Sequence, residues 1–204
     1  MGATAASIFG LSVATGGGIT GVVETSGLTS IAFARGALIV DIGKAHGAGT
    51  VRIAQDEAER ALLWKGRKSA FGAVARIAPD YYLHDAVVPR TKLPEVVDAI
   101  NRAAEARGVR IANILHAGDG NLHPNLSFDR RDPEQLRTIR ELGGEILRIC
   151  IDAGGVLSGE HGIGLEKRDY MCLMFSEADL EPMRWVHEAF DPGDRCNPGK
   201  QIPA

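Results

Sequence analysis

Apolar residues recur at helical spacing in four stretches of the chain, and the residues at their ends are typical of helix boundaries. The longest stretch begins at Asp132-Pro133, an N-cap followed by a proline in the first turn, and ends at Gly154. Another ends at Gly108, since a glycine can take the left-handed conformation that closes a helix. We predict helices over 56–65, over 93–107, from Asp132 to Gly154, and from the capping-box-like Ser176–Asp179 to just before Pro192.

Shorter β-type runs lie between these helices, at Tyr81–Val88, Val109–Leu115 and Asn125–Phe128, with a weaker candidate at Val51–Ala54. A few strands interleaved with long helices predict an α+β fold in which helices pack on one face of a sheet. The length is sufficient for one domain of ordinary size with its own hydrophobic core.

The first 40 residues differ from the rest, because Glu24 and Arg35 are their only charged side chains and glycine, alanine, serine and threonine dominate. No basic segment precedes an apolar core, which argues against a signal peptide. The glycines at 16–18 interrupt the apolar runs, which argues against a membrane-spanning helix. A lone glycine cluster is also an unspecific sign of a phosphate-binding loop. We therefore expect a poorly structured leader at 1–44 and a folded domain at 45–204.

Overall composition limits the classes of function open to the protein. With 204 residues, of which 45% are hydrophobic and 24% charged, it has the composition of a globular protein. A net charge of −3 offers no electrostatic argument for binding nucleic acid or an anionic membrane. Cys150, Cys172 and Cys196 form an odd, scattered set, which argues against a disulfide framework. We expect a cytoplasmic protein with neither nucleic acid nor membrane as a partner.

The segment His116-Ala-Gly-Asp-Gly-Asn-Leu-His123 places two histidines on either side of a glycine-rich turn. Predicted strands flank this segment, so the two imidazoles are expected to face each other across the turn. Gly118 and Gly120 permit positive φ there. A polar hairpin whose histidines only contact water is the alternative, and for a single histidine it would be the better interpretation. Two histidines framing one turn favour a shared ligand.

A second glycine turn, Ser158-Gly-Glu-His-Gly-Ile-Gly164, carries the adjacent pair Glu160 and His161. Its glycines remove side chains around that pair, which permits the close approach of a ligand. Neighbours in an extended chain point to opposite faces, so we expect Glu160 to bind a metal and His161 to transfer a proton. A solvated turn at a helix end is the alternative for this segment taken by itself.

Together the two turns offer imidazole nitrogens from His116 and His123 and a carboxylate oxygen from Glu160. These are the ligands expected of a catalytic divalent ion that keeps one coordination position open for substrate. A structural zinc site would typically use several cysteines, and no cysteine pair in the sequence has ligand spacing. The expected ion is Zn²⁺ or Mn²⁺, whose ligand preferences overlap.

These two turns and the ending Phe190-Asp-Pro-Gly-Asp-Arg-Cys-Asn-Pro-Gly-Lys200 resemble the C-terminal domain of the FAD-linked oxidases of the vanillyl-alcohol oxidase superfamily. The stretches 51–67 and 80–90 fit the same pattern, so the resemblance runs from about residue 45 to the end. The nearest branch contains glycolate oxidase flavin subunits, with D-lactate and D-2-hydroxyglutarate dehydrogenases as relatives. The resemblance implies a ferredoxin-like antiparallel sheet that caps a flavin domain.

The resemblance also implies roles for individual residues and a reaction. His116, His123 and Glu160 match the metal ligands of the metal-dependent members, and His161 matches the general base. The implied reaction is the oxidation of a small 2-hydroxy acid, such as glycolate or D-lactate, with FAD as the acceptor of the hydride.

Four further residues match positions that contact the substrate or the flavin. Asn125 matches a substrate-contacting amide, and Arg67 matches an arginine that holds the substrate carboxylate. From the residues alone, the basic cluster around Arg67 is better interpreted as a solvated helix end. Asn197 and Lys200 match a segment that returns to the flavin domain.

In this family a FAD-binding domain precedes the C-terminal domain, and the resemblance does not extend over such a domain here. We therefore expect a truncated or split chain that takes its flavin from a separate FAD-binding chain, with an iron–sulfur subunit as a further partner. Two other functions stay open. The same site could serve a metal-dependent hydrolase, with His161 or Asp119 as the base, or it could belong to an inactive metal-binding remnant.

Overall fold

The computed structural model describes residues 10–12, 38, 40–42, 44–45 and 53–203, apart from the side chains of residues 10–12 and of Arg67. Most of the predicted leader lies outside these ranges, and its boundary at residue 44 stays a prediction. Residues 51 and 52 of the weaker strand candidate also lie outside, and Ile53 and Ala54 are not in a strand.

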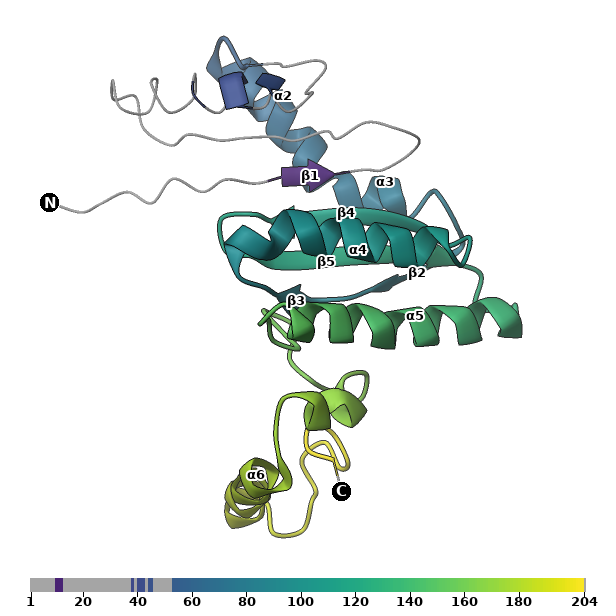
Figure 1. Cartoon of the computed structure of the whole chain (residues 1–204), viewed down its shortest axis with the longest axis vertical. Coiled ribbons are helices and arrows are strands. Elements are labelled where there is room, and N and C mark those ends of the chain that lie inside the picture. The colour runs from purple at the N-terminus through teal and green to yellow at the C-terminus, as the bar shows by residue number, and fades with distance from the viewer. Residues whose placement is uncertain (1–9, 13–37, 39, 43, 46–52, 204) are drawn as a thin grey trace, which may run out of the picture.

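An antiparallel sheet forms the centre of the domain (Figure 1). Its strands are β1 (Gly10–Ser12), β2 (Asp80–Leu83), β3 (Ala86–Val87), β4 (Arg110–His116) and β5 (Asn121–Phe128). The order is β1-β4-β5-β2, and β3 pairs with β5 further along the same edge as β2. In the longest pairing, between β4 and β5, Arg110 aligns with Ser127 and His116 with Asn121.

The elements follow one another along the chain as in a ferredoxin-like fold. β2 and β3 together serve as the first strand, and α4 (Leu93–Glu105), β4, β5 and α5 (Pro133–Asp152) follow. The last strand is reduced to a single antiparallel bridge between Val156 and Val87. The predicted α+β class with a ferredoxin-like antiparallel sheet is therefore confirmed.

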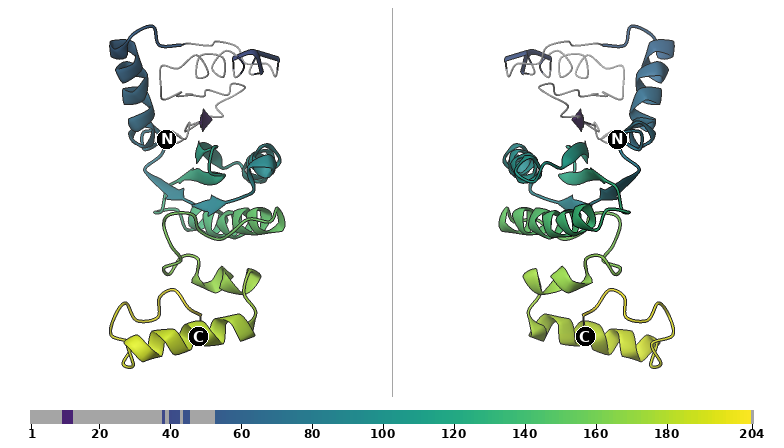
Figure 2. Two further views of the ribbon diagram at one scale, coloured as in Figure 1. Left: turned by 90° about the vertical axis from the view of Figure 1, so that its left-hand side faces the viewer. Right: turned by 90° about the vertical axis from the view of Figure 1, so that its right-hand side faces the viewer.

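α4 and α5 cover one face of the sheet and enclose the main hydrophobic core with it (Figure 2). Burial of each large aliphatic side chain contributes about 1.5–3 kcal/mol, so this face is the stable base of the domain. The buried residues include Val96, Ile100 and Ala104 of α4, Ile139, Leu142 and Ile146 of α5, and Leu122 and Leu126 of β5.

The ends of the helices agree with the signals in the sequence. The Asp132 carboxylate accepts hydrogen bonds from backbone N–H groups in the first turn of α5. Gly108, just after α4, has a φ of 65°. At the start of α6 (Glu177–Phe190), the Asp179 carboxylate accepts hydrogen bonds from the backbone N–H and the hydroxyl of Ser176. These contacts are local, which is why the sequence predicts them.

Two helices, α2 (Glu57–Lys68) and α3 (Ala70–Val74), precede β2 in the chain. α3 packs on the opposite face of the sheet from α4 and α5. There Ala70 and Val74 form a second small core with Ala112 and Ile114 of β4.

The C-terminal segment extends the packing beyond α5. A short 3₁₀ helix, η1 (Arg90–Lys92), precedes α4, and a second, η2 (Arg168–Leu173), precedes α6. Leu147 of α5, Met171 of η2 and Leu180 of α6 pack together, and α6 lies at the far end of the molecule from β1 (Figure 1). Among the described residues, no helix is both long and apolar enough to cross a membrane. All three cysteines are free, as predicted.

The predicted strand at 81–88 is interrupted. β2 ends at Leu83 and β3 begins at Ala86, so that His84 and Asp85 separate them. The His84 ring packs against α5, where a Cβ added to Gly143 would come within 2.5 Å of its Nε2. Asp85 interacts instead with the second glycine turn, and it places a buried carboxylate at the other face of the sheet.

Candidate metal centre

The face of the sheet away from α4 and α5 carries the candidate ligands. Side chains alternate along β5, so Leu122 enters the main core while His123 and Asn125 lie on the other face. His116 shares that face, because Ile114, two residues before it on β4, packs against α3.

The register of β4 and β5 sets the distance between the two histidines. His116 aligns with Asn121 and His123 aligns with Ile114, so the imidazoles are diagonal neighbours. Their ring centroids are 5.4 Å apart, and the ring planes meet at 87°. The structure therefore brings the two imidazoles together.

The turn between these strands depends on Gly120. Its φ is 78°, and a Cβ added there would lie 2.1 Å from the carbonyl oxygen of Val88. The Gly120 carbonyl accepts a hydrogen bond from the Val88 N–H at 3.0 Å. The hairpin turn is thus pressed against the strand end that follows β3. Of the two glycines that permit positive φ in this turn, Gly120 adopts it.

The second glycine turn reaches the same face through the bridge between Val87 and Val156, which leads the chain directly to Ser158. Gly159 then lies on the sheet: an added Cβ would be 2.6 Å from Val87 Cγ2 and 2.9 Å from Asn121 Nδ2. This glycine is needed for packing of the turn on the sheet, whereas its predicted purpose was the approach of a ligand.

Asp85 holds this turn in place. It is 0% exposed, and its Oδ2 accepts hydrogen bonds from the Ser158 hydroxyl at 2.8 Å and from the backbone N–H groups of Gly159, Glu160 and His161 at 2.9, 3.0 and 2.9 Å. Successive N–H groups of an extended strand point in opposite directions. Three that converge on one oxygen require a compact turn, so the extended conformation assumed for this segment is wrong.

The charge of Asp85 is stabilised by several neighbours. The Lys167 ammonium donates a hydrogen bond to the Asp85 carbonyl at 2.5 Å and lies 3.3 Å from Oδ2. Burial opposes ionisation of Asp85, but the hydrogen bonds from His161, Ser158 and Glu160, together with Lys167, outweigh it and hold the pKa of the carboxyl below its usual range. Burial lowers the pKa of Lys167, and the nearby Asp85 charge opposes that change.

The three predicted ligands lie close enough to share an ion. One ligand atom from each of His116, His123 and Glu160 lies within 4.8 Å of the others. Glu160 Oε1 is 4.0 Å from His116 Nε2, and Glu160 Oε2 is 3.6 Å from His123 Nε2. In a tetrahedral zinc site with bonds near 2.1 Å, the ligand atoms are about 3.4 Å apart. The two observed separations, 3.6 and 4.0 Å, exceed this by about 0.2 and 0.6 Å.

Buried polar atoms at this site also favour a bound ion. His123 Nε2 and Asp85 Oδ1 are buried and have no hydrogen-bond partner within the described part of the chain. Such atoms almost always have a partner in folded proteins. Burial, opposed by the Asp85 charge, lowers the pKa of His123 and favours the neutral imidazole that a metal requires. The residues therefore fit a divalent cation.

His161 lies beside the group of ligands. Its ring is stacked on that of His123, with centroids 5.2 Å apart and planes inclined by 29°. His161 is exposed and does not belong to the set whose ligand atoms gather within 4.8 Å. A proton acceptor at this position would lie close to any group that binds beside the candidate ligands.

Asn125 is fully buried on the same face of β5. Its Nδ2 donates hydrogen bonds to the carbonyl oxygens of Ala112 at 3.1 Å and His123 at 2.7 Å. These two bonds fix the orientation of the amide, and its Oδ1 has no partner among the described residues. Oδ1 is therefore the amide atom that remains without a hydrogen bond within the described part of the chain.

The other predicted site residues lie in other segments of the chain. Arg67 belongs to α2, and its side chain lies outside the described part of the structure. Asn197 has a φ of 58°, and its Oδ1 accepts a hydrogen bond from Lys200 Nζ at 3.1 Å. The Gln201 N–H donates to the Gly164 carbonyl at 3.0 Å, which anchors this ending beside the second glycine turn.

Asp85 and Lys167 are not among the residues predicted from the sequence to have a role in the site. A signal for Asp85 was present, because a carboxylate next to the apolar residues 86–88 must find partners if the strand is buried. Lys167 offered no such signal, since it is one of four consecutive charged residues at 166–169.

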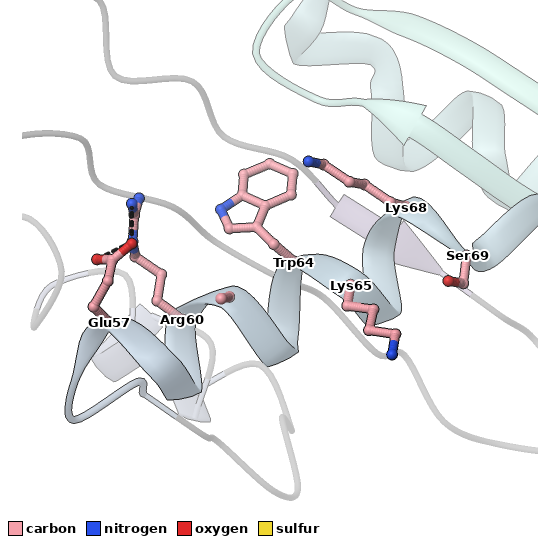
Figure 3. Close-up of a pocket in the computed structure, with 7 residues that line it drawn as sticks. Glu57, Arg60, Trp64, Lys65, Lys68 and Ser69 are labelled. Atoms are coloured by element: carbon pink, nitrogen blue, oxygen red, sulfur yellow. Dashed lines mark hydrogen bonds and ion pairs between the residues drawn. The ribbon is translucent and has the colours of Figure 1, made fainter.

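Two cavities of the described structure lie away from these residues. One of about 520 Å³ follows α2, where Trp64 and Lys68 project from the same side of the helix (Figure 3). Another of about 600 Å³ lies between α4, α5 and η2, and Arg107, Arg140 and Tyr170 line part of it. Neither cavity is lined by the candidate ligands of the metal centre.

A second group of metal-ligand types lies at the C-terminal end of α6, where His187 of its last turn meets Asp191 and Asp194. Each of the two carboxylates already accepts a hydrogen bond from a backbone N–H of the turn that follows the helix. Asp191 accepts a hydrogen bond from the Cys196 N–H at 2.6 Å, and Asp194 accepts one from the Gly199 N–H at 3.3 Å. This group closes the C-terminal turn of the helix.

The sequence matches the family described as FAD linked oxidases, C-terminal domain, over residues 5–201. The glycolate oxidase subunit GlcD of Escherichia coli (strain K12) is 50% identical over 163 residues, which cover 80% of this chain and 33% of that protein. GlcD of Bacillus subtilis (strain 168) is 38% identical over 161 residues, covering 79% and 34%. The mitochondrial D-lactate dehydrogenase (cytochrome) of Arabidopsis thaliana is 30% identical over 168 residues, covering 81% and 30%. The chain spans about a third of the length of these relatives.

Proposed function

The chain belongs to the C-terminal domain family of the FAD-linked oxidases, and on this premise we propose that it forms the substrate- and metal-binding part of a flavin-dependent 2-hydroxy-acid oxidoreductase. Its relatives bear the names of glycolate oxidase subunits and of D-lactate dehydrogenase, so glycolate or D-lactate is the proposed type of substrate. The convergence of His116, His123 and Glu160 on one face of the sheet is the observation that carries the proposal.

The proposed ion is Zn²⁺ or Mn²⁺. Such an ion, when bound, lowers the cost of removing a proton from an alcohol oxygen. His116 and His123 would offer it neutral imidazoles and Glu160 a carboxylate. Three protein ligands leave one position open for the substrate, as in catalytic rather than structural sites.

Three other residues would bind the substrate and move its proton. His161 would accept the hydroxyl proton, because its exposed ring stacks on that of His123 and an imidazole nitrogen can accept a proton. Asn125 would contact the substrate through Oδ1. Arg67 would hold the carboxylate with its planar two-pronged guanidinium. Orientation of this kind can remove several kcal/mol from a barrier.

FAD would supply the acceptor for the hydride, and the chemistry of that step belongs to the cofactor. We propose that a separate FAD-binding chain brings it and that an iron–sulfur subunit completes the assembly. Asn197 and Lys200 would contact the flavin from the ending that the Gly164 carbonyl anchors beside the site.

Metal binding is tested by titrating the metal-free chain with Zn²⁺ in a calorimeter. One site is expected. In His123→Ala the affinity should fall by more than about 100-fold, since loss of an outer-shell partner alone costs 10- to 100-fold. His187→Ala, in the other group of metal-ligand types, is the matched control and should leave the affinity unchanged. Equal affinity in His123→Ala and the wild type would contradict the proposed site.

Activity is tested by mixing the chain with the FAD-binding part of the E. coli relative, expressed as a separate chain. Reduction of an artificial electron acceptor by glycolate or D-lactate is expected only when both chains are present. His161→Ala should abolish turnover and retain the metal. Metal-dependent ester hydrolysis without flavin would indicate the hydrolase instead, and metal binding with neither activity would indicate an inactive remnant.

A further inference from the structure

The two oxygens of Asp85 have different surroundings. Oδ2 accepts hydrogen bonds from the Ser158 hydroxyl and three consecutive backbone N–H groups, and Lys167 lies beside it. Oδ1 is buried, has no hydrogen-bond partner among the described residues, and lies 3.6 Å from His123 Nε2. One side chain therefore connects the second glycine turn with the β4–β5 hairpin, the two segments that carry the candidate metal ligands.

The backbone around Asp85 is held by the sheet on both sides. The His84 N–H donates to the Pro124 carbonyl at 3.0 Å, and Ala86 pairs with Leu122 of β5. The backbone position of Asp85, between β2 and β3, is thus fixed by the contacts of its two neighbours.

The second glycine turn is built around Asp85. The Ser158 hydroxyl donates to Asp85 at 2.8 Å and accepts a hydrogen bond from the Gly162 N–H at 2.7 Å. The Ser158 hydroxyl therefore links two parts of the turn to each other and links the turn to the buried Asp85 carboxylate. Converging backbone N–H groups form a concave anion-binding arrangement, which a carboxylate fills better than a neutral amide.

We propose that Asp85 is a positioning residue, which holds the second glycine turn so that the Glu160 carboxylate stays within metal-binding reach of His116 and His123. The inference rests on the proposed metal-binding function. The Glu160 side chain is 56% exposed, so its own packing does not fix its place. The backbone hydrogen bond from Glu160 to Asp85 supplies the constraint instead.

Lys167 allows the positioning role to be separated from a purely structural one. Lys167→Met removes the ion pair with Asp85 but leaves the four hydrogen bonds from the turn. Asp85→Asn removes the ion pair and also weakens the anchor, because an amide oxygen is a poorer acceptor than a carboxylate. With that oxygen facing the turn, the amide N–H would point towards His123 Nε2 and compete with a metal for its lone pair.

The test measures Co²⁺ binding to the metal-free chain, because the absorption bands of Co²⁺ report its coordination geometry. In Asp85→Asn we expect the affinity to fall about 10- to 100-fold, as on loss of an outer-shell partner, with altered bands. In Lys167→Met we expect a lower unfolding temperature but wild-type affinity and bands. Asp169→Asn, at an exposed carboxylate, is the matched control and should change neither.

Amide hydrogen exchange supplies a readout that does not depend on metal. In Asp85→Asn the amides of Gly159, Glu160 and His161 should exchange at least about tenfold faster than in the wild type, because their acceptor is weakened. Lys167→Met should leave these amides protected relative to the rest of the domain.

Unchanged Co²⁺ affinity and unchanged exchange in Asp85→Asn would overturn the inference. The inference would also be overturned if Asp85→Asn and Lys167→Met both bound Co²⁺ more weakly, each in proportion to its loss of stability. Where Asp85→Asn does not fold, Ser158→Ala replaces it: weaker Co²⁺ binding and faster exchange at Gly162 support the inference, and wild-type values overturn it. If the wild type binds no Co²⁺, the proposed metal function fails, while exchange at Gly159, Glu160 and His161 still decides whether Asp85 holds the turn.

Discussion

Gly120, in the hairpin turn between β4 and β5, lies against Val88, the residue that follows β3. Its φ is 78°, and an added Cβ would lie 2.1 Å from the Val88 carbonyl oxygen. Even favourable carbon–oxygen contacts are about 3.3 Å long, so an alanine would force the turn to move by roughly 1 Å. We predict that Gly120→Ala destabilises the domain and displaces His116 from His123.

Two costs determine the size of this effect. A left-handed backbone costs an L-residue about 1–2 kcal/mol, and overpacking costs about 1–3 kcal/mol. The free energy of unfolding should fall by about 2–5 kcal/mol, which corresponds to a Tm lowered by roughly 4–20 °C in a protein of this size. Gly162→Ala is the matched control, since its φ is 79° but no atom lies within 4 Å of an added Cβ. It should show only the backbone cost of about 1–2 kcal/mol.

Urea unfolding followed by circular dichroism measures both free energies, and Zn²⁺ titration of the folded variants reports on the two histidines. Gly120→Ala should lose Zn²⁺ affinity because the hairpin that aligns the imidazoles is displaced. If Gly120→Ala loses no more stability than Gly162→Ala, the close approach of Val88 does not constrain the turn, and the reasoning fails.

Two further predictions concern the burial of His84 and the packing of Gly159. Burial, then the nearby Lys167 charge, lowers the pKa of His84 from 6.5 to about 4. Between these pH values His84 takes up a proton in the unfolded chain but not in the folded chain. The contribution of His84 to the free energy of unfolding is therefore complete above pH 6.5, and it falls by up to about 3 kcal/mol towards pH 4. Urea midpoints at pH 7 and pH 5 should show a fall in the wild type that is smaller in His84→Leu. Gly159→Ala should overlap Val87 and Asn121 and lower Zn²⁺ affinity; a titration that matches the wild type would show that this turn carries no ligand.

The elements and the candidate ligands could be predicted because their signals are local. Asp132 and Ser176 mark helix starts through contacts with residues two or three positions away. The β-type residues at 125–128 predict a strand, but β5 begins earlier, at Asn121, in the part that is predicted as the turn. His116 and His123 stand on two strands joined by a short turn, so their proximity follows from the hairpin itself.

Tertiary structure alone decided how the second turn meets that hairpin. Asp85 is 73 positions from Ser158 and 82 from Lys167, and contacts over such distances leave no periodic trace in the sequence. Gly159 likewise looks like any flexible residue until the sheet packs against it. Local residue preferences set where helices and strands begin and end, whereas a buried carboxylate acquires its partners only when distant segments pack together and exclude water.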